Sequence, residues 1–281
     1  MTTLFARYHK VPLSAALLEL TPRVILLLCL FFVQFSSLAT TTALYESPRL
    51  LHLNTADGLN QNTVYDLLID RNDFLYVATE EGLNRFDGHN VLSIEGKNRE
   101  FASNPVYVLF EDSRGKMWIS TGLGGVYQYD LTSREHKQVF SGKYLNDPNW
   151  HQYAESIIED DDGNIIIAAN HQVIRYNYAS DSIEVLFELN EMQINDTQNI
   201  RVALKSGDIL LVGTDKGLFS KNLQDQKVKE IEFIGATSDI LRTMNNNDVK
   251  KLKLFKNGNL WIGTVEGLYQ TSLSGLKQHI L

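Results

Sequence analysis

Acidic side chains are most concentrated in one short segment of the chain, between Glu159 and Asn164. Asp160 and Asp162 stand on alternate residues before Gly163, and oxygen ligands placed this way before a glycine are what a calcium loop needs. The helix–loop–helix spacing and the downstream glutamate of a full calcium loop are missing, so the segment also fits a charged turn between strands. The sequence therefore predicts no bound metal, and Asp160 and Asp162 are the candidates if one binds.

Enzyme motifs give no catalytic residue. The glycines from Gly122 to Gly125 have the composition of a phosphate loop, but a strand pattern follows them where a helix is required. The sequence contains neither a Gly-x-Ser-x-Gly elbow nor a His-Glu-x-x-His pair. Asp66 and Glu155 are the only acids on the predicted inner strands, where a glycosidase would carry its acid and base. We therefore predict a protein that is not an enzyme and that uses no cofactor.

An aromatic residue and a histidine stand together in a polar stretch that reads as a loop. Trp150 and His151 follow Asn146-Asp147-Pro148-Asn149, and loops carried by a rigid scaffold often hold ligand contacts. These two residues are the candidates for ligand binding.

The elements that must position such residues are repeated. One short phrase of apolar residues that ends in a small residue occurs five times, at residues 75–79, 117–121, 165–169, 210–214 and 260–264. Successive copies end 42 to 50 residues apart. Repetition at this period indicates one supersecondary unit stacked several times.

Each repeat reads as four short strands. In the first, residues 63–69, 74–79, 83–86 and 90–94 have strand composition, and Asp, Asn and Gly residues mark the turns between them. Four antiparallel strands in about 45 residues make one propeller blade. We predict an all-β protein, a β-propeller with about five blades near residues 62–95, 104–141, 152–188, 197–234 and 247–281. The third repeat differs, because Asn170-His171-Gln172 stands where the others have a turn glycine.

The bulky residue of the repeated phrase has a predicted place in this fold. It is Tyr76, Trp118, Ile166, Leu211 or Trp261. Large side chains there are expected to fill the wedge between neighbouring blades.

Charge and cysteine content exclude several classes of protein. The net charge is −8, and because residues 1–39 carry +2, the rest of the chain carries −10. Such a surface repels phosphate backbones, so nucleic acid is not an expected partner. The single cysteine, Cys29, allows no internal disulfide framework.

The first 39 residues resemble an export signal. Basic residues precede the apolar run from Val24 to Val33, and Ser37-Leu38-Ala39 offers small residues for cleavage after Ala39. The basic region is long, so residues 1–39 fit either a cleaved signal peptide or a retained N-terminal anchor. Residues 40–281 form the predicted propeller, outside the cytoplasm in either case.

Two segments carry a resemblance to a known family. Residues 57–64, Asp-Gly-Leu-Asn-Gln-Asn-Thr-Val, and residues 81–88, Glu-Gly-Leu-Asn-Arg-Phe-Asp-Gly, resemble the opening blade of the two-component-regulator propeller family. This family forms the periplasmic sensor region of bacterial hybrid histidine kinases and some diguanylate cyclases. Its propellers usually have seven blades, so five repeats imply either an incomplete ring or a five-bladed ring. In a five-bladed ring, residues 50–53 would supply the closing strand.

The resemblance implies a function. We expect an extracytoplasmic ligand sensor of a receptor in the inner membrane, whose kinase or cyclase output domain would lie beyond Leu281. A small extracellular ligand, with glycans among the candidates, and a homodimer are the expected partners. Membrane contact would come only through the leader or a missing C-terminal helix. A periplasmic propeller glycosidase or lyase and a protein-interaction scaffold remain the alternatives.

Overall fold

The computed structural model describes residues 50–123, 125–141, 143–144, 147–151, 153–169, 171–192, 199–231 and 248–275. The chain divides into two units, Met1–Leu51 and His52–Leu281, and only residues 50 and 51 of the first are described. The leader and the cleavage position at Ala39 therefore lie outside the described residues.

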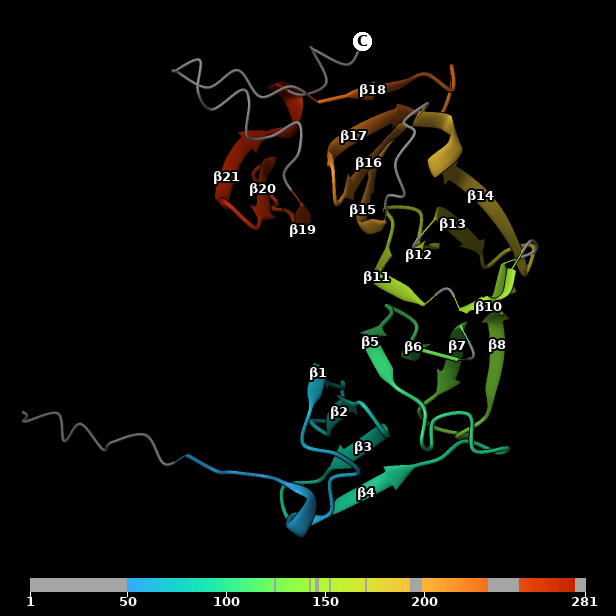
Figure 1. The fold of residues 1–281 in the computed structure, drawn as a ribbon, viewed down its shortest axis with the longest axis vertical. Helices are drawn as coiled ribbons and strands as arrows, with labels where there is room; N and C mark the ends of the chain where they lie inside the picture. The colour runs from blue at the N-terminus through green and yellow to red at the C-terminus, as the bar shows by residue number, and fades with distance from the viewer. Residues whose placement is uncertain are drawn as a thin grey trace, which may run out of the picture. The chain divides into compact units, whose positions relative to one another are not determined.

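The second unit is built of five antiparallel sheets that follow one another along the chain (Figure 1). Four sheets have four strands and the last has three among the described residues, and within each sheet every strand pairs with the next in sequence. This is the all-β architecture of four-stranded propeller blades that the repeats predict. No helix among the described residues is long and apolar enough to span a membrane.

The strands of the first two blades are short and evenly spaced. Blade 1 contains β1 (Val64–Ile69), β2 (Leu75–Thr79), β3 (Gly82–Phe86) and β4 (Val91–Ile94). Blade 2 contains β5 (Val106–Glu111), β6 (Lys116–Thr121), β7 (Gly125–Asp130) and β8 (His136–Phe140). A short 3-10 helix, η1 (Thr55–Asp57), precedes blade 1.

The remaining blades follow the same plan. Blade 3 contains β11 (Ala154–Glu159), β12 (Ile165–Ala169), β13 (Gln172–Asn177) and β14 (Ser182–Glu188), and η2 (Leu189–Met192) follows it. Blade 4 contains β15 (Ile200–Ser206), β16 (Ile209–Thr214), β17 (Gly217–Asn222) and β18 (Val228–Glu230). Blade 5 contains β19 (Val249–Leu254), β20 (Asn259–Thr264) and β21 (Gly267–Ser272).

Two sequence predictions about single segments are wrong. Residues 146–151 read as a loop, but Asp147–His151 forms β10, which pairs with β9 (Lys143–Tyr144) in a separate two-stranded sheet. Residues 50–53 read as a closing strand, but they form no strand. Leu50 and Leu51 are largely exposed, because no ladder among the described residues pairs with them.

The turn after the first strand of a blade is held by a buried aspartate. In blade 1, Oδ1 of Asp70 accepts hydrogen bonds from the backbone N–H groups of Asn72 and Phe74, both at 2.9 Å. Asp112 and Asp160 make the equivalent pair of bonds in blades 2 and 3. A carboxylate that satisfies two backbone donors fixes the tight turn.

The turn between the second and third strands requires a glycine in blade 1. Gly82 has a φ of 126°, and a Cβ there would lie 2.3 Å from the carbonyl oxygen of Phe101. Blade 3 has no glycine at this point. Its hairpin nevertheless forms, as the pairing of Ala169 with Gln172 shows. The intervening Asn170 lies outside the described residues.

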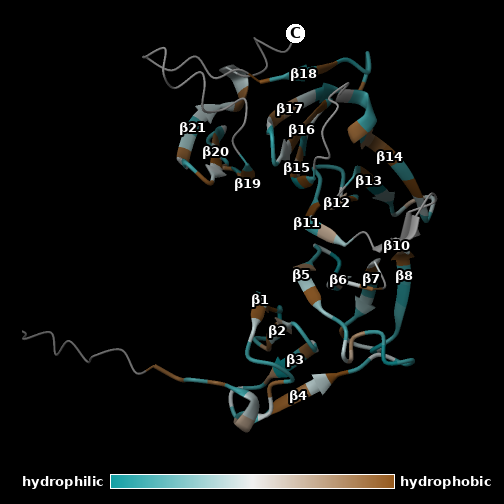
Figure 2. Ribbon diagram, in the orientation of Figure 1, coloured by the Kyte–Doolittle hydropathy of each residue, from teal (hydrophilic) through white to brown (hydrophobic). Residues whose placement is uncertain are grey.

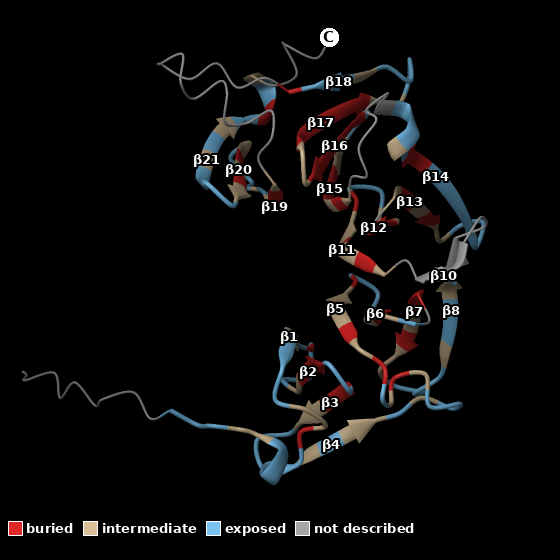
Figure 3. Cartoon of the chain, viewed as in Figure 1, coloured by how far each residue is buried: buried red, intermediate tan, exposed pale blue. Residues whose placement is uncertain are grey.

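The core consists of four clusters, one at each junction between consecutive blades. At the junction of blades 2 and 3, Trp118 of β6 packs with Ile165 and Ile167 of β12. The second strand of each blade therefore buries its central bulky side chain against the residues that flank the same position in the next blade. Figure 3 shows buried residues on β2, β16 and β17, while β8 is intermediate or exposed and much of β14 is exposed. Figure 2 shows hydrophobic residues on β5, β11 and β16.

Four of the five bulky residues in the repeated phrase are buried as expected: Tyr76, Trp118, Ile166 and Leu211 are at most 3% exposed. Trp261 is only half-buried. The difference is explained by position, since no further blade packs against blade 5 among the described residues.

Ion pairs connect the blades at three of the four junctions, at the end of the first strand. Glu111 pairs with Arg71 in the turn of the preceding blade. Glu159 likewise pairs with Arg114 at 3.3 Å. At the next junction the charges are reversed, and Nζ of Lys205 lies 3.3 Å from Oδ2 of Asp162.

Asp112 joins the turn of blade 2 to the junction with blade 3. Its Oδ2 accepts a 2.9 Å hydrogen bond from Nε1 of Trp118 and a second from the hydroxyl of Tyr178. Burial, followed by the hydrogen bond to Asp112, raises the pKa of Tyr178. The hydroxyl of Tyr178 therefore stays protonated and keeps its role as a donor.

We predict that Asp112→Ala lowers the free energy of unfolding by about 2–4 kcal/mol, because buried donors that include Trp118 Nε1 lose their acceptor. Denaturant unfolding followed by tryptophan fluorescence measures the change. Asp161→Ala, at an exposed position in the corresponding turn of blade 3, is the control and should stay within about 0.5 kcal/mol of the wild type. Equal losses in the two variants would contradict this role for Asp112.

Candidate functional site

The first strand of every blade contains a β-bulge near its start. The ladder register shifts between Val64 and Asp66 in blade 1, and the four other blades shift at the same place. The residue left between the two paired positions is Tyr65, Tyr107, Glu155, Arg201 or Lys250. A bulge leaves its extra residue outside the ladder and changes the direction of its side chain. The bulges thus place five side chains at the same end of five successive strands.

Three tyrosines form a row across blades 1 to 3. The ring centroids of Tyr65 and Tyr107 are 4.9 Å apart, and those of Tyr107 and Tyr153 are 4.2 Å apart. Tyr107 therefore lies between two other rings. Tyr65, at the end of the row, is 43% exposed and offers a ring face for stacking.

A chain of ion pairs continues from the tyrosines across blades 3 to 5. The hydroxyl of Tyr153 donates to Oε1 of Glu155 at 3.3 Å, and Nη1 of Arg201 donates to the same oxygen at 2.8 Å. Nε of Arg201 lies 3.4 Å from Oδ1 of Asp248, which also pairs with Lys250 through its other oxygen. We call Tyr65, Tyr107, Tyr153, Glu155, Arg201 and Asp248 the belt.

The ion-pair half of the belt is partly desolvated and has unused hydrogen-bonding capacity. The side chains of Glu155 and Arg201 are each 24% exposed. Nε of Arg201 and Oδ1 of Asp248 are buried and make no hydrogen bond among the described residues. These two atoms face each other as an ion pair at 3.4 Å, so a ligand would meet this half of the belt at the exposed parts of the Glu155 and Arg201 side chains.

The belt borders a cavity of about 560 Å³. The cavity is lined by residues from the first strands of all five blades, among them Tyr65, Tyr107 and Glu155 from the belt and Leu252 from blade 5, together with Tyr153 just before β11. Its volume lies in the range of small-molecule sites, and its mixture of apolar walls with a few polar groups is typical of them.

Tyr107 and Tyr153 of the belt are neutral at physiological pH, because the pKa of each is raised. Burial, followed by the charge of Glu155, raises the pKa of Tyr153 to about 12. Burial is also the main cause that raises the pKa of Tyr107, with Tyr65, Glu80 and Glu155 adding to it. Their hydroxyls therefore serve as hydrogen-bond donors and acceptors and not as bases.

The two acids of the inner strands have different environments. Oδ2 of Asp66 accepts a 2.8 Å hydrogen bond from the backbone N–H of Leu109 in the next blade, and Oδ1 accepts one from Leu67. Asp66 thus fastens blade 1 to blade 2. Glu155 belongs to the belt, where Arg201 neutralises its charge.

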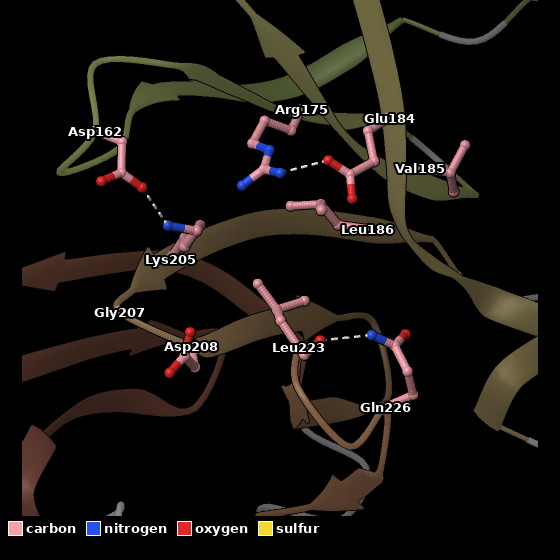
Figure 4. Close-up of a pocket in the computed structure, with 10 residues that line it drawn as sticks. All are labelled: Asp162, Arg175, Glu184, Val185, Leu186, Lys205, Gly207, Asp208, Leu223 and Gln226. Carbon is pink, nitrogen blue, oxygen red and sulfur yellow. Dashed lines mark hydrogen bonds and ion pairs between the residues drawn. The ribbon is translucent and has the colours of Figure 1, made fainter.

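The candidate metal ligands lie beside a lysine. Asp160 is buried and Asp162 is exposed. Nζ of Lys205 lies 3.4 Å from Oδ2 of Asp160. The same ammonium group lies 3.3 Å from Oδ2 of Asp162, as Figure 4 shows. The ammonium group thus occupies the position where a cation would approach these two carboxylates. Among the described residues no group of three His, Cys, Asp or Glu side chains is placed to hold a metal.

The structure describes only the backbone of the two candidates for ligand binding. Trp150 and His151 belong to β10, but their side chains lie outside the described part of the chain.

Figure 4 shows a second cavity, of about 400 Å³, between blades 3 and 4. Most of its charged groups are matched, since Arg175 pairs with Glu184 and Lys205 with Asp162, and Asp208 accepts a hydrogen bond from Gln224. The belt cavity is therefore the better candidate site.

Sequence reasoning missed five of the six belt residues, Tyr65, Tyr107, Tyr153, Arg201 and Asp248. A signal for the bulge residues was present: aligning the five repeats on their phrases sets Tyr65, Tyr107, Glu155 and Lys250 in one column, just inside the start of the first strand. Arg201 joins this column once the turn of the fourth repeat, which is one residue shorter, is allowed for. A column of aromatic and charged residues within otherwise apolar strands marks positions that the core does not use.

The fold is that of known β-propellers. The chain is similar to the extracellular domain of BT3049 from B. thetaiotaomicron, described as a hybrid two-component system, with 21% identity and a TM-score of 0.64 over 81% of this chain and 31% of that one. The corresponding domain of BT4673 from the same organism gives 17% identity and a TM-score of 0.61 over 74% and 27%. Virginiamycin B lyase from Staphylococcus aureus gives 13% and 0.51 over 76% and 71%.

The family model for the two component regulator propeller matches residues 100–122, which contain β5 and β6 of blade 2. The resemblance to this propeller family is therefore confirmed. The chain spans about a third of the length of the extracellular domains that it matches. No curated protein matches the chain.

We predict that Glu155→Gln lowers the pKa of Tyr153 from about 12 toward the ordinary tyrosine value of about 10. The substitution removes a negative charge beside the hydroxyl and leaves the positive charge of Arg201. Tyrosinate absorbance against pH measures the shift, with Tyr153→Phe identifying the signal. Glu184→Gln at the second cavity is the matched control, and an unchanged Tyr153 titration in Glu155→Gln would count against this electrostatic coupling.

Proposed function

We propose that residues 52–275 act as the extracytoplasmic ligand-sensing propeller of a bacterial signal-transduction receptor, of the two-component kinase or diguanylate cyclase type. The observation that carries the proposal is the belt. Its three tyrosines and Glu155 line one cavity, and Arg201 and Asp248 continue the belt from Glu155 toward blade 5. The export signal in the sequence and the similarity in fold to extracellular domains of two-component systems support the location and the class.

The belt can recognise a small ligand by two kinds of contact. The tyrosine row offers flat apolar surface, on which sugar rings, aromatic groups and cations stack. The ion-pair half offers charged hydrogen-bonding groups through the side chains of Glu155 and Arg201, each 24% exposed. Since the two halves come from different blades, a ligand that touches both would brace blades 1 to 5 against one another. Such bracing is one way for ligand binding in the cavity to change the conformation of the rest of a receptor.

The acids of the cavity favour binding over catalysis. An acid–base mechanism requires two carboxyl groups that are free to exchange protons with a substrate. Both oxygens of Asp66 accept backbone hydrogen bonds, and Glu155 is paired with Arg201. We therefore place the chain among binding proteins and not among periplasmic glycosidases or lyases.

The proposal predicts binding of a small molecule by the isolated chain in a calorimetric screen of soluble oligosaccharides and peptides. Tyr107→Ala and Arg201→Ala should each weaken binding of any ligand found by about tenfold or more, because each removes a contact worth at least about 1.4 kcal/mol. Phe255→Ala is the matched control, since Phe255 is an exposed aromatic residue at the opposite end of a first strand.

Two outcomes would contradict the proposal. A ligand whose affinity is unchanged in both belt variants would place the site elsewhere. Binding of other proteins with no response to any small molecule would favour the scaffold alternative.

A further inference from the structure

The tyrosine half of the belt presents an open aromatic surface to the cavity. Tyr65, Tyr107 and Tyr153 all line the cavity, and Tyr107 lies between the other two rings. Tyr65 stands at the end of the row and is 43% exposed. Its ring is therefore the part of the row that is most open to a ligand.

The face of an aromatic ring attracts cations, and this chain uses that attraction elsewhere. The guanidinium carbon of Arg114 lies 4.0 Å from the ring centroid of Tyr178, and that of Arg85 lies 4.5 Å from the centroid of Phe74. No basic side chain in the described part of the chain lies over a belt tyrosine in this way. The belt rings can therefore take a cation that the described residues do not supply.

Two carboxylates that form no ion pair among the described residues stand beside these rings. Asp66 follows Tyr65 and lines the same cavity, and its two oxygens accept hydrogen bonds from backbone N–H groups. Oε2 of Glu80 accepts a 2.8 Å hydrogen bond from the neutral side chain of Gln61. Burial is the first cause that raises the pKa of Tyr107, and the charge of Glu80 is among the others. The charge of Glu80 therefore reaches the tyrosine row.

The basic groups of the site lie in its other half. Arg201 is paired with Glu155 and Asp248, and Lys251 lines the cavity from β19 in blade 5. The rings of blades 1 and 2 therefore lie beside negative charge that the ion pairs of the described residues do not cancel.

We propose that the tyrosine half of the belt binds an organic cation, an amine or quaternary ammonium group with apolar substituents, which stacks on Tyr65 while Asp66 and Glu80 supply the opposite charge. The proposal rests on the belt cavity being the ligand site of the proposed function, and it names the ligand class that this site takes. The ring faces attract the positive charge and the cavity covers the apolar substituents.

The polar groups of the cavity make a sugar ring a poorer match. Sugar hydroxyls require several donors and acceptors that are still free. Both oxygens of Asp66 already accept from backbone N–H groups, and Oε1 of Glu155 accepts from Tyr153 and Arg201. The charge of a carboxylate still attracts a cation at a distance when its oxygens are occupied in this way.

Calorimetric titration of the full chain with choline and with 3,3-dimethylbutan-1-ol, which has the same shape without the charge, tests the proposal. We expect choline to bind with a Kd of about 1 mM or lower and the alcohol to bind at least about tenfold more weakly, because only the cation is attracted by the rings and carboxylates. Equal affinities for the two molecules, or no binding of choline up to about 50 mM, would overturn the proposal.

Variants locate the cation. Tyr65→Leu keeps apolar volume but removes the ring, so it should weaken choline binding about fivefold, whereas Tyr65→Phe keeps the ring and should stay within about twofold of the wild type. Glu80→Gln should weaken binding about threefold, since it removes one attracting charge. Glu135→Gln, at an exposed carboxylate in the turn between β7 and β8, is the matched control and should bind choline like the wild type.

The outcomes separate this proposal from the proposed function. Binding of an oligosaccharide or peptide that weakens in Tyr107→Ala, with no binding of choline, would keep the belt as the ligand site and overturn the cation. Choline binding that Tyr65→Leu and Glu80→Gln leave unchanged would place the cation elsewhere and overturn this proposal. Failure of every small molecule, choline included, would contradict both. Circular dichroism checks that the variants keep their β-structure, and the comparison of choline with the alcohol decides the proposal on the wild type even if one variant does not fold.

Discussion

The packing of each blade against the next is the interaction on which the rest of this structure depends. A four-stranded blade is too thin to enclose a core, so its apolar residues are buried only where a second blade covers them. Trp118 illustrates the constraint: its ring is fully buried between Ile165 and Ile167 of the next blade, while its Nε1 donates to Asp112 of its own. Where no neighbour is described, as for Trp261, the same kind of side chain stays half-exposed.

The same packing explains why the functional groups lie where they do. The second and third strands of the blades are occupied by the junctions, so most of their side chains are not available to a ligand. The first strands face the shared cavity, and their bulges turn one residue per blade out of the ladder. The apolar clusters at the junctions do not include Tyr107, Glu155 or Arg201, so the chain can vary these residues without changing the apolar core, which is how one scaffold can serve different ligands.

Much of the fold could be predicted from the sequence because the blade is a local unit. Its strands, its Asp turns and its period all lie within about 45 residues, and four of the five bulky phrase residues are buried as expected. The belt could not be predicted in the same way. The contact between Tyr107 and Tyr153 and the ion pair between Arg201 and Asp248 each join residues from different blades. The bulges that bring these residues together depend on hydrogen-bond register, which composition does not reveal.

The candidate metal ligands show that a local sequence pattern does not reveal contacts between blades. Asp160 and Asp162 have the spacing of cation ligands, but the cation beside them is the ammonium group of Lys205, which comes from the next blade. A local pattern could not anticipate this pairing. In blade 2 the corresponding carboxylate, Asp112, meets Trp118 and Tyr178, so one turn motif is completed differently at each junction.

Native-state hydrogen exchange tests the central claim, that blades are stabilised by their neighbours, most directly. The account predicts that the backbone amides of β6, β12 and β16, which are covered on both faces, exchange slowest, and that those of β19, β20 and β21, in a blade with one free face, exchange faster. Equal protection of β12 and β20 would contradict it, because blade 5 would then be stable without a forward neighbour.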